Sequence, residues 1–247
     1  MKNLTLIPLL ITLSFVANAG KKTVESAAVQ VEKNEKKSAE TIIKPASSLT
    51  QTTSVTTELS SELFEEVVLS ESTTINLLGQ KFELRPVSHG IRKKKVFGLA
   101  TVKVYVAELF SANPDKLEKT EDGILNSLKK SEAIQLKLTM TRDLSGKKIS
   151  DSFKEALESN GLDPKALSTE LNSVLNELLT VEEFKRNETI SLTSVWKDTK
   201  ATLIIQKPNG QIKEIQGDEK FVNDLFSIWF GKPADDKLAD LKKSLIK

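Results

Sequence analysis

The chain has 247 residues, enough for one sizeable domain with additional segments, and its 38% hydrophobic and 28% charged residues are typical of a soluble protein with an apolar core. The formal net charge is only +2 and aromatic residues make up 5% of the chain, so neither electrostatics nor base stacking supports nucleic-acid binding. Cysteine is absent, which excludes disulfides and acylation on cysteine.

The N-terminus is typical of a secretory signal peptide, which we assign to residues 1–19. A basic Lys2 precedes an apolar run at 4–16, and the Ala-Asn-Ala sequence at 17–19 fits a cleavage site. A membrane anchor is the alternative, but the run is shorter than the ~20 residues a spanning helix needs. We therefore predict cleavage, no stable membrane insertion and a periplasmic location.

The segment 20–60 differs in composition from the rest of the chain. It is rich in Ser, Thr, Lys and Glu and contains no Phe, Trp or Tyr. Such a segment cannot bury enough apolar surface to offset the entropy of ordering it. We predict a disordered spacer over 20–60, with a docking arm as the alternative, and one folded domain over 61–247.

Alternation of apolar and polar residues predicts strands. The clearest one covers 134–141, where Ile, Leu, Leu and Met alternate with Gln, Lys, Thr and Thr, giving one apolar and one polar face. Similar or shorter patterns, separated by turn signals such as Pro208-Asn209-Gly210, predict further strands at 73–78, 81–85, 102–107, 189–196, 201–207 and 211–216.

Apolar stripes with helical spacing predict helices at 149–157, 164–178, 221–230 and 238–245. We expect the second of these to begin at the proline in position 164, with Asp163 as its N-cap. Strands are thus followed by helices, then strands, then helices. This order favours an α+β fold, with helices packed on an antiparallel sheet, over a parallel nucleotide-binding fold.

Several kinds of chemistry lack the residues they need. The chain has a single histidine, His89, and no nucleophile-elbow, dinucleotide-binding or phosphate-loop motif. Without cysteine it has no set of zinc ligands, and its acidic residues do not have calcium-loop spacing. We therefore predict no metal and no cofactor, and interpret His89 as a surface or loop residue.

Five motifs in a fixed order carry a family resemblance. They are Ser-His-Gly-Ile-Arg at 88–92, Val-Phe-Gly at 96–98, Lys-Val-Tyr-Val-Ala-Glu-Leu-Phe at 103–110, Leu-Thr-Met-Thr-Arg-Asp-Leu-Ser at 138–145, and the segment 221–233 with its Ile-Trp-Phe-Gly-Lys-Pro end. Together they resemble the bacterial chalcone isomerase-like proteins over about residues 60–247. The resemblance implies an open-faced β-sheet layered with helices, and a ligand cleft between the two layers.

The resemblance also implies a role for Arg92. In the wider group, plant enzymes cyclise chalcones to flavanones and non-enzymatic members bind fatty acids, and in both the arginine of the Gly-apolar-Arg motif faces the ligand. A guanidinium can hold a carboxylate with two hydrogen bonds or stabilise an enolate. The alternative is that Arg92 heads the basic run 92–95 and faces water.

This sequence departs from the plant enzymes where their catalytic threonine and tyrosine lie. Alignment on Tyr105 places Ala100 at the threonine position, with Thr101 adjacent, and a separate alignment on residues 143–148 places Ile149 at the tyrosine position. An isoleucine can neither orient a water molecule nor donate a proton. The resemblance thus implies a non-catalytic binder of a fatty acid or similar small apolar carboxylate, with Arg92, Thr101 and Tyr105 as candidate ligand-binding residues.

We expect the cleft to be lined by apolar side chains of 102–106, 134–140 and 149–157 around Arg92. Two other functions stay open. One is an isomerase or intramolecular lyase acting on an unsaturated carbonyl compound, in which Arg92 would stabilise developing negative charge. The other is a structural or partner-binding protein of the envelope that uses the segment 20–60.

Overall fold

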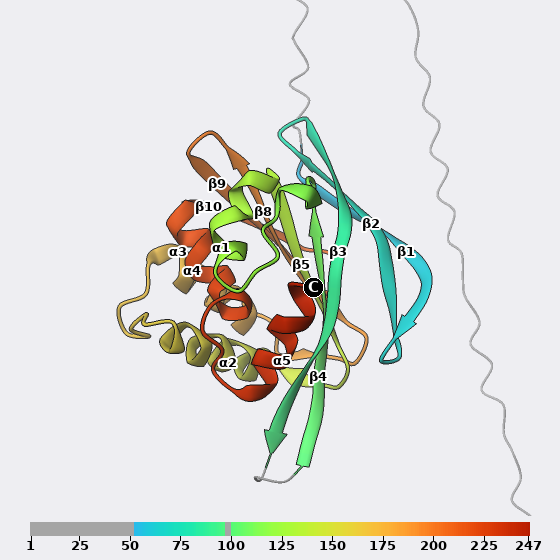
Figure 1. Ribbon diagram of the computed structural model, residues 1–247, viewed down its shortest axis with the longest axis vertical. Coiled ribbons are helices and arrows are strands. Elements are labelled where there is room, and N and C mark those ends of the chain that lie inside the picture. The colour runs from blue at the N-terminus through green and yellow to red at the C-terminus, as the bar shows by residue number, and fades with distance from the viewer. Residues whose placement is uncertain (1–51, 97–99) are drawn as a thin grey trace, which may run out of the picture. The chain divides into compact units, whose positions relative to one another are not determined.

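Figure 1 shows the computed structural model of the chain, which describes residues 52–96 and 100–247. Within these residues, eight antiparallel strands form one curled sheet in the order β1-β2-β3-β4-β5-β8-β9-β10, and β6 pairs with β7. The strands are β1 (Ser54–Phe64), β2 (Val67–Leu77), β3 (Gln80–Val96), β4 (Ala100–Ser111), β5 (Ala133–Met140), β6 (Leu144–Ser145), β7 (Glu183–Phe184), β8 (Thr189–Lys197), β9 (Lys200–Gln206) and β10 (Ile212–Asp218).

The helices gather on one side of this sheet, and β1 and β2 lie on the other (Figure 1). The helices are α1 (Gly123–Ser127), α2 (Gly146–Ser159), α3 (Thr169–Leu179), α4 (Glu219–Phe230) and α5 (Asp236–Leu245), with two 3-10 turns at Pro114–Lys116 and Leu128–Ser131. The α+β architecture predicted from the order of the elements, an open-faced antiparallel sheet layered with helices, is confirmed. The short helix α1 has no counterpart among the predicted elements.

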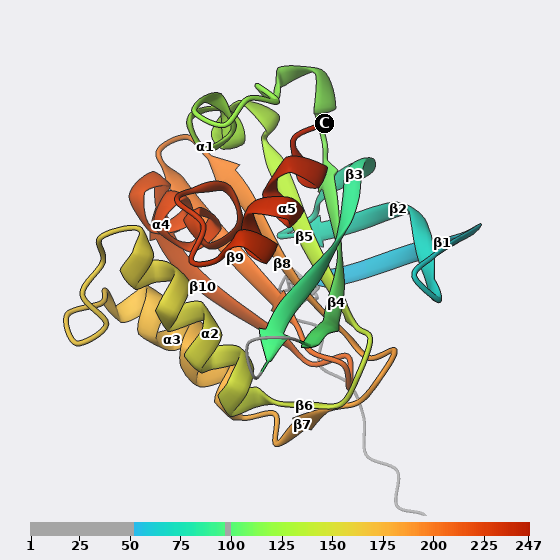
Figure 2. The same ribbon diagram turned by 60° about the horizontal axis from the view of Figure 1, so that its bottom comes forward.

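The main core lies between the sheet and the helices. Leu136, Leu138 and Met140 of β5 are fully buried there, together with Phe153 of α2 and Trp229 of α4. Figure 2 shows α2 and α3 side by side in the layer of helices. The amphipathic spacing of each helix therefore presents its apolar face to the sheet, as the sequence pattern indicates.

Strand β5 combines the predicted alternation with complete burial. Its alternation indicates one apolar and one polar face, and the structure buries both, since all eight of its residues are buried. Lys137 on that polar face donates a hydrogen bond to the hydroxyl of Ser70 in β2. The strand is buried on both sides because β2 covers the face that the helices do not.

The expected end of the spacer at residue 60 is wrong. Strand β1 begins at Ser54 and pairs with β2 from there onward, so residues 54–60 belong to the sheet. Val55, Thr56 and Thr57 have high strand propensity, and as an edge strand the segment needs little apolar material. The rest of the expected spacer up to residue 51 and the expected signal peptide lie outside the described residues.

The expected start of the second helix is also wrong. Asp163 accepts the backbone N–H of Lys165 at 2.9 Å in a turn, and α3 begins only at Thr169. Its N-cap is Ser168, whose hydroxyl accepts the N–H of Leu171 at 3.2 Å. An aspartate before a proline starts a turn as readily as a helix, and here the turn is formed.

Candidate ligand-binding site

A cavity of about 430 Å³ lies between the sheet and the helices. This volume lies in the range of pockets that hold small organic ligands. Most of its wall is apolar, with residues from β4, α2, α4 and α5 such as Val102, Val104, Ile149, Phe153, Ile228 and Leu238. The expected contributions of 102–106 and 149–157 are therefore present, whereas no residue of 134–140 reaches the wall. The last turn of α4 and the first turn of α5 take its place.

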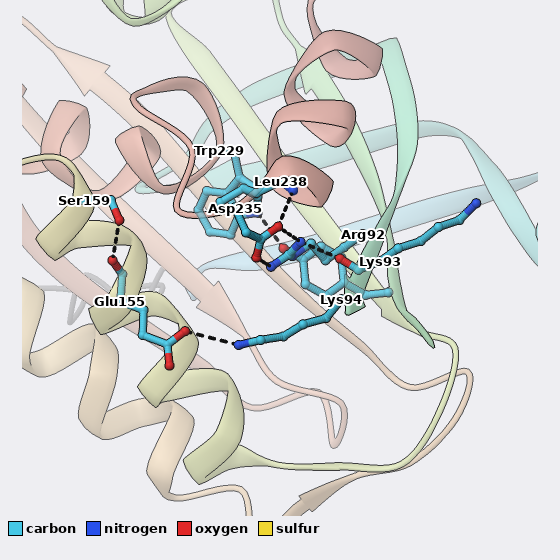
Figure 3. A network of polar contacts seen from close by, with 9 residues as sticks. Arg92, Lys93, Lys94, Glu155, Ser159, Trp229, Asp235 and Leu238 are labelled. Carbon is cyan, nitrogen blue, oxygen red and sulfur yellow. Dashed lines mark hydrogen bonds and ion pairs between the residues drawn. The ribbon is translucent and has the colours of Figure 1, made fainter. Parts of the chain in front are cut away.

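Arg92 is a buried residue of β3 at the wall of this cavity, with 8% of its surface exposed. Its Nη1 and Nη2 donate to the two carboxylate oxygens of Asp235 at 2.8 and 2.5 Å, and Nη1 also donates to the carbonyl of Lys93 (Figure 3). The lysines after it point elsewhere, with Lys94 reaching Glu155 at 3.1 Å and Lys95 reaching Asp236 at 3.3 Å. The interpretation that Arg92 faces water with the rest of the basic run is therefore wrong.

A β-bulge in β4 sets which side chains face the cavity. Arg92 lies opposite Tyr105, but the next residue of β3, Lys93, lies opposite Lys103, so Val104 has no partner. An unpaired residue of this kind reverses the alternation of the strand. Val104 and Tyr105 consequently both line the cavity, although they are adjacent in the sequence.

Tyr105 is a buried residue that lines the cavity, and its hydroxyl accepts the indole N–H of Trp229 at 3.0 Å. Burial raises the pKa of Tyr105 above its usual value of 10.0, and the nearby positive charge of Arg92 only partly opposes this shift. The phenol is therefore protonated at neutral pH. Its own proton is available to an acceptor in the cavity.

Thr101 does not reach this site, contrary to the prediction that it binds ligand. Val102 and Val104 face the cavity, so the alternation of the strand turns Thr101 to the other side, where it is exposed. Ala100 is exposed as well. Ile149 does line the cavity, in the first turn of α2, and contributes an apolar surface there.

Asp235 is a site residue that the sequence analysis missed. It is the N-cap of α5, and its side chain accepts the backbone N–H of Leu238 at 2.8 Å. Burial disfavours its charge, but the hydrogen bonds from Arg92 and Leu238 outweigh burial and hold the pKa of Asp235 below its usual value of 3.8. An aspartate three residues before an apolar helical stripe is a recognisable N-cap signal, but nothing local links it to Arg92.

Two further basic residues at the cavity wall were also missed. Arg142 and Lys148 line the cavity, and neither lies within 4.0 Å of a carboxylate in the part of the chain that the structure describes. The lining residues Arg92 and Lys94 are each paired with an acidic residue. The lining carboxylate of Asp151 is paired with Lys147 at 2.6 Å. The wall carries four basic and three acidic residues, so an anionic group meets an excess of positive charge.

The curled sheet, its layer of helices and the cavity between them define the chalcone isomerase-like class of fold. The model of the family described as chalcone isomerase-like matches residues 62–246. The chain therefore belongs to the chalcone isomerase-like family. A search of the curated proteins gives no match.

The fold also resembles a solved structure. The crystal structure of the Arabidopsis thaliana fatty-acid binding protein AtFAP1 superposes with a TM-score of 0.51 and 16% sequence identity, covering 70% of this chain and 95% of that one. At this identity the likeness shows the fold. Among the described residues, no helix has the length and apolar character needed to cross a membrane.

Proposed function

We propose that this protein binds a fatty acid or a similar small apolar carboxylate in the cavity between sheet and helices, and that it does so without catalysing a reaction. The observation that carries the proposal is the buried guanidinium of Arg92 at the wall of a mainly apolar cavity. Asp235 already pairs with this guanidinium, and the N–H groups that Asp235 and Lys93 leave free suit a carboxylate. The fatty-acid-binding relative with the same fold supports this class of ligand.

The donors of Arg92 leave room for a ligand carboxylate. A guanidinium has five N–H groups, and three of them are used by Lys93 and Asp235. Within the described residues, Nε–H and the second N–H of Nη2 have no partner. These two lie on one edge of the guanidinium and match the two oxygens of a carboxylate. The apolar tail then packs along Val102, Val104 and Phe153.

The proposed cellular location of the protein follows from the signal-peptide pattern at its N-terminus. The pattern at 1–19 supports export through a cleaved signal peptide, so we place the protein in the periplasm. Protein secreted by cells and analysed by mass spectrometry should begin at Gly20. A chain that still begins at Met1 and fractionates with membranes would contradict this part of the proposal.

One observation favours a second candidate, an isomerase or intramolecular lyase acting on an unsaturated carbonyl compound. The protonated hydroxyl of Tyr105 and the guanidinium of Arg92 both line the cavity, so an enolate there would meet a proton donor and a positive charge. Against this candidate, Ile149 lines the cavity and is the residue that the resemblance aligns with the tyrosine of the plant enzymes. A spectrophotometric assay with chalcones decides, because catalysis must exceed the buffer rate and vanish in Arg92→Gln.

The binding proposal is tested by calorimetry on delipidated full-length protein with decanoate and 1-decanol. We expect decanoate to bind at least about tenfold more tightly, since the alcohol lacks the charge that Arg92 pairs with, and tenfold corresponds to about 1.4 kcal/mol. Arg92→Gln should remove this preference, and the exposed Lys95→Gln should retain it. Equal binding of the two compounds, or an unchanged preference in Arg92→Gln, would rule out the proposal.

Arg92→Gln leaves the carboxylate of Asp235 half-buried without its partner, which can unfold the protein. The double variant with Asp235→Asn removes both charges and keeps an N-cap for α5. It should fold with an unchanged circular dichroism spectrum and still lack the preference for decanoate. The loss of selectivity is then separated from a loss of structure.

A further inference from the structure

Five polar residues form a row across the sheet, on the face away from the helices. His89 of β3 lies opposite Glu108 of β4, which lies opposite Lys137 of β5; next come Ser191 of β8 and Gln206 of β9. Residues directly opposite one another in a sheet share a face. We call this set the polar row. Apolar clusters lie on either side of it, one around Val106 and one around Phe110.

The middle of the polar row is buried, which is costly for such groups. Glu108, Lys137 and Ser191 are only 3%, 8% and 4% exposed. Removing an ion from water costs several kcal/mol even after relaxation of the protein. Sequences usually place apolar residues at such positions, so a buried polar row in the middle of a sheet calls for an explanation.

The two charges of the row are paired with each other, although Oε2 of Glu108 accepts no hydrogen bond among the described residues. Lys137 lies 3.1 Å from Glu108 and donates to the hydroxyl of Ser70, whose backbone N–H donates to Glu108 at 2.6 Å. These contacts neutralise both charges. The hydroxyl of Ser191 has no hydrogen-bond partner among the residues that the structure describes. Ser191 is thus a buried polar group whose hydroxyl is unused within the described residues.

A second cavity, of about 680 Å³, opens onto the polar row. Lys137, Ser191 and Gln206 form its polar wall, and the hydroxyls of Thr139 and Thr189 continue that wall. The facing wall comes from β1 and β2 and contains the aliphatic residues Val55, Leu59, Val67 and Val68. In Figure 1 these two strands lie across the sheet from the helices, so this cavity is separate from the one at Arg92.

The lining cations of the second cavity are paired, whereas the lining carboxylate of Glu188 has no cation within 4.0 Å among the described residues. Besides the Lys137–Glu108 pair, Lys207 pairs with Glu177 at 3.1 Å and Glu66 pairs with Arg186. The carboxylate of Glu188 is engaged by the backbone N–H of Lys185. No lining cation lacks a counter-charge among the described residues, so an anionic ligand gains nothing here. What the wall offers is hydroxyl and amide groups, which suit an uncharged ligand.

We propose that the second cavity binds an uncharged polyhydroxylated molecule, a sugar of one or two rings. A sugar ring carries hydroxyls on its edges and an aliphatic C–H surface on its face. The edge hydrogen-bonds to Ser191, Gln206 and the third N–H of Lys137, and the face packs on the aliphatic wall of β1 and β2. The ligand supplies the partner that Ser191 lacks. This site is independent of the carboxylate site at Arg92.

Saturation-transfer NMR on the full-length protein tests the class of ligand, with glucose, maltose and N-acetylglucosamine as neutral probes. Gluconate and glucosamine serve as charged counterparts of similar size. We expect signals from at least one neutral sugar that exceed those of both charged compounds, and that persist when decanoate is present. Absence of binding by every neutral sugar, or stronger binding of gluconate or glucosamine, would overturn the proposal.

A pair of variants on β8 tests the place of binding. Ser191→Ala should weaken sugar binding by about fivefold, the equivalent of one hydrogen bond of ~1 kcal/mol. Ser194→Ala is the matched control, because Ser194 is also buried with an unpartnered hydroxyl but lines neither cavity. Gln206→Ala, at a half-buried position, is a second variant in case Ser191→Ala fails to fold. Equal weakening by Ser194→Ala would overturn the assignment.

Discussion

Asp235 binds Arg92 with both of its carboxylate oxygens, at 2.8 and 2.5 Å, and also caps α5. One side chain therefore links a strand of the sheet to the start of the last helix, as Figure 3 shows. It also places a negative charge beside the guanidinium that we propose as the ligand anchor. A ligand carboxylate must bind next to Asp235 or displace it, so Asp235 should limit the affinity of the site.

Asp235→Asn should accordingly bind decanoate more tightly, by roughly tenfold or about 1.4 kcal/mol. The substitution removes the competing charge, while asparagine still caps the helix. Isothermal calorimetry measures the change. Asp218→Asn is the matched control, because Asp218 caps α4 through Phe221 and has no arginine among its described partners. Weaker binding in Asp235→Asn would show instead that Asp235 holds Arg92 in its binding geometry.

The same pair predicts how stability depends on pH. The pKa of Asp235 is lowered in the folded protein, so the unfolded chain binds its proton more readily, and the pair stabilises the fold above pH ~4. This contribution is lost as the pH falls through the folded pKa. Urea unfolding should therefore show a stability difference between wild type and Asp235→Asn that is constant from pH 7 to about 5 and shrinks below about 4. A difference that grows on acidification would contradict this assignment.

Tyr105→Phe should destabilise the protein by about 1–3 kcal/mol, because it leaves the indole N–H of Trp229 without its acceptor in a buried place. Urea unfolding measures the loss, and an unchanged slope of the transition would show that the denatured state is not the cause. Thr101→Val on the same strand is the control and should change stability by less than about 0.5 kcal/mol. A similarly small change for Tyr105→Phe would mean that water satisfies the indole.

The sequence predicts what is local and misses what depends on distant partners. The helices at 221–230 and 238–245 follow from apolar spacing, and they are found as α4 and α5. Arg92 was singled out by a motif within five residues. Asp235, by contrast, lies 143 residues further along the chain, and only the packing of α5 on β3 brings the two together.

Two features that the sequence does not predict share a physical cause. Thr101 was expected at the site because the resemblance places it beside the plant enzymes' threonine position, but the unpaired Val104, which turns Thr101 away, depends on how β3 pairs with β4. The alternation of β5 gives one apolar and one polar face, but it does not show that β2 covers the polar one. In both cases the strand beside or above decides which residues meet water.

The buried pair of Glu108 and Lys137 should behave as a coupled unit. Lys137→Met leaves the carboxylate of Glu108 buried and unpaired, and Glu108→Gln does the same for the ammonium, so each should cost about 3–5 kcal/mol. The double variant removes both charges and should cost clearly less than the sum of the two single changes. Urea unfolding of the four proteins measures this coupling. The exposed pair Lys147–Asp151 is the control, with an expected coupling below about 1 kcal/mol. Additive losses at Glu108 and Lys137 would show that the two charges do not act as a buried pair.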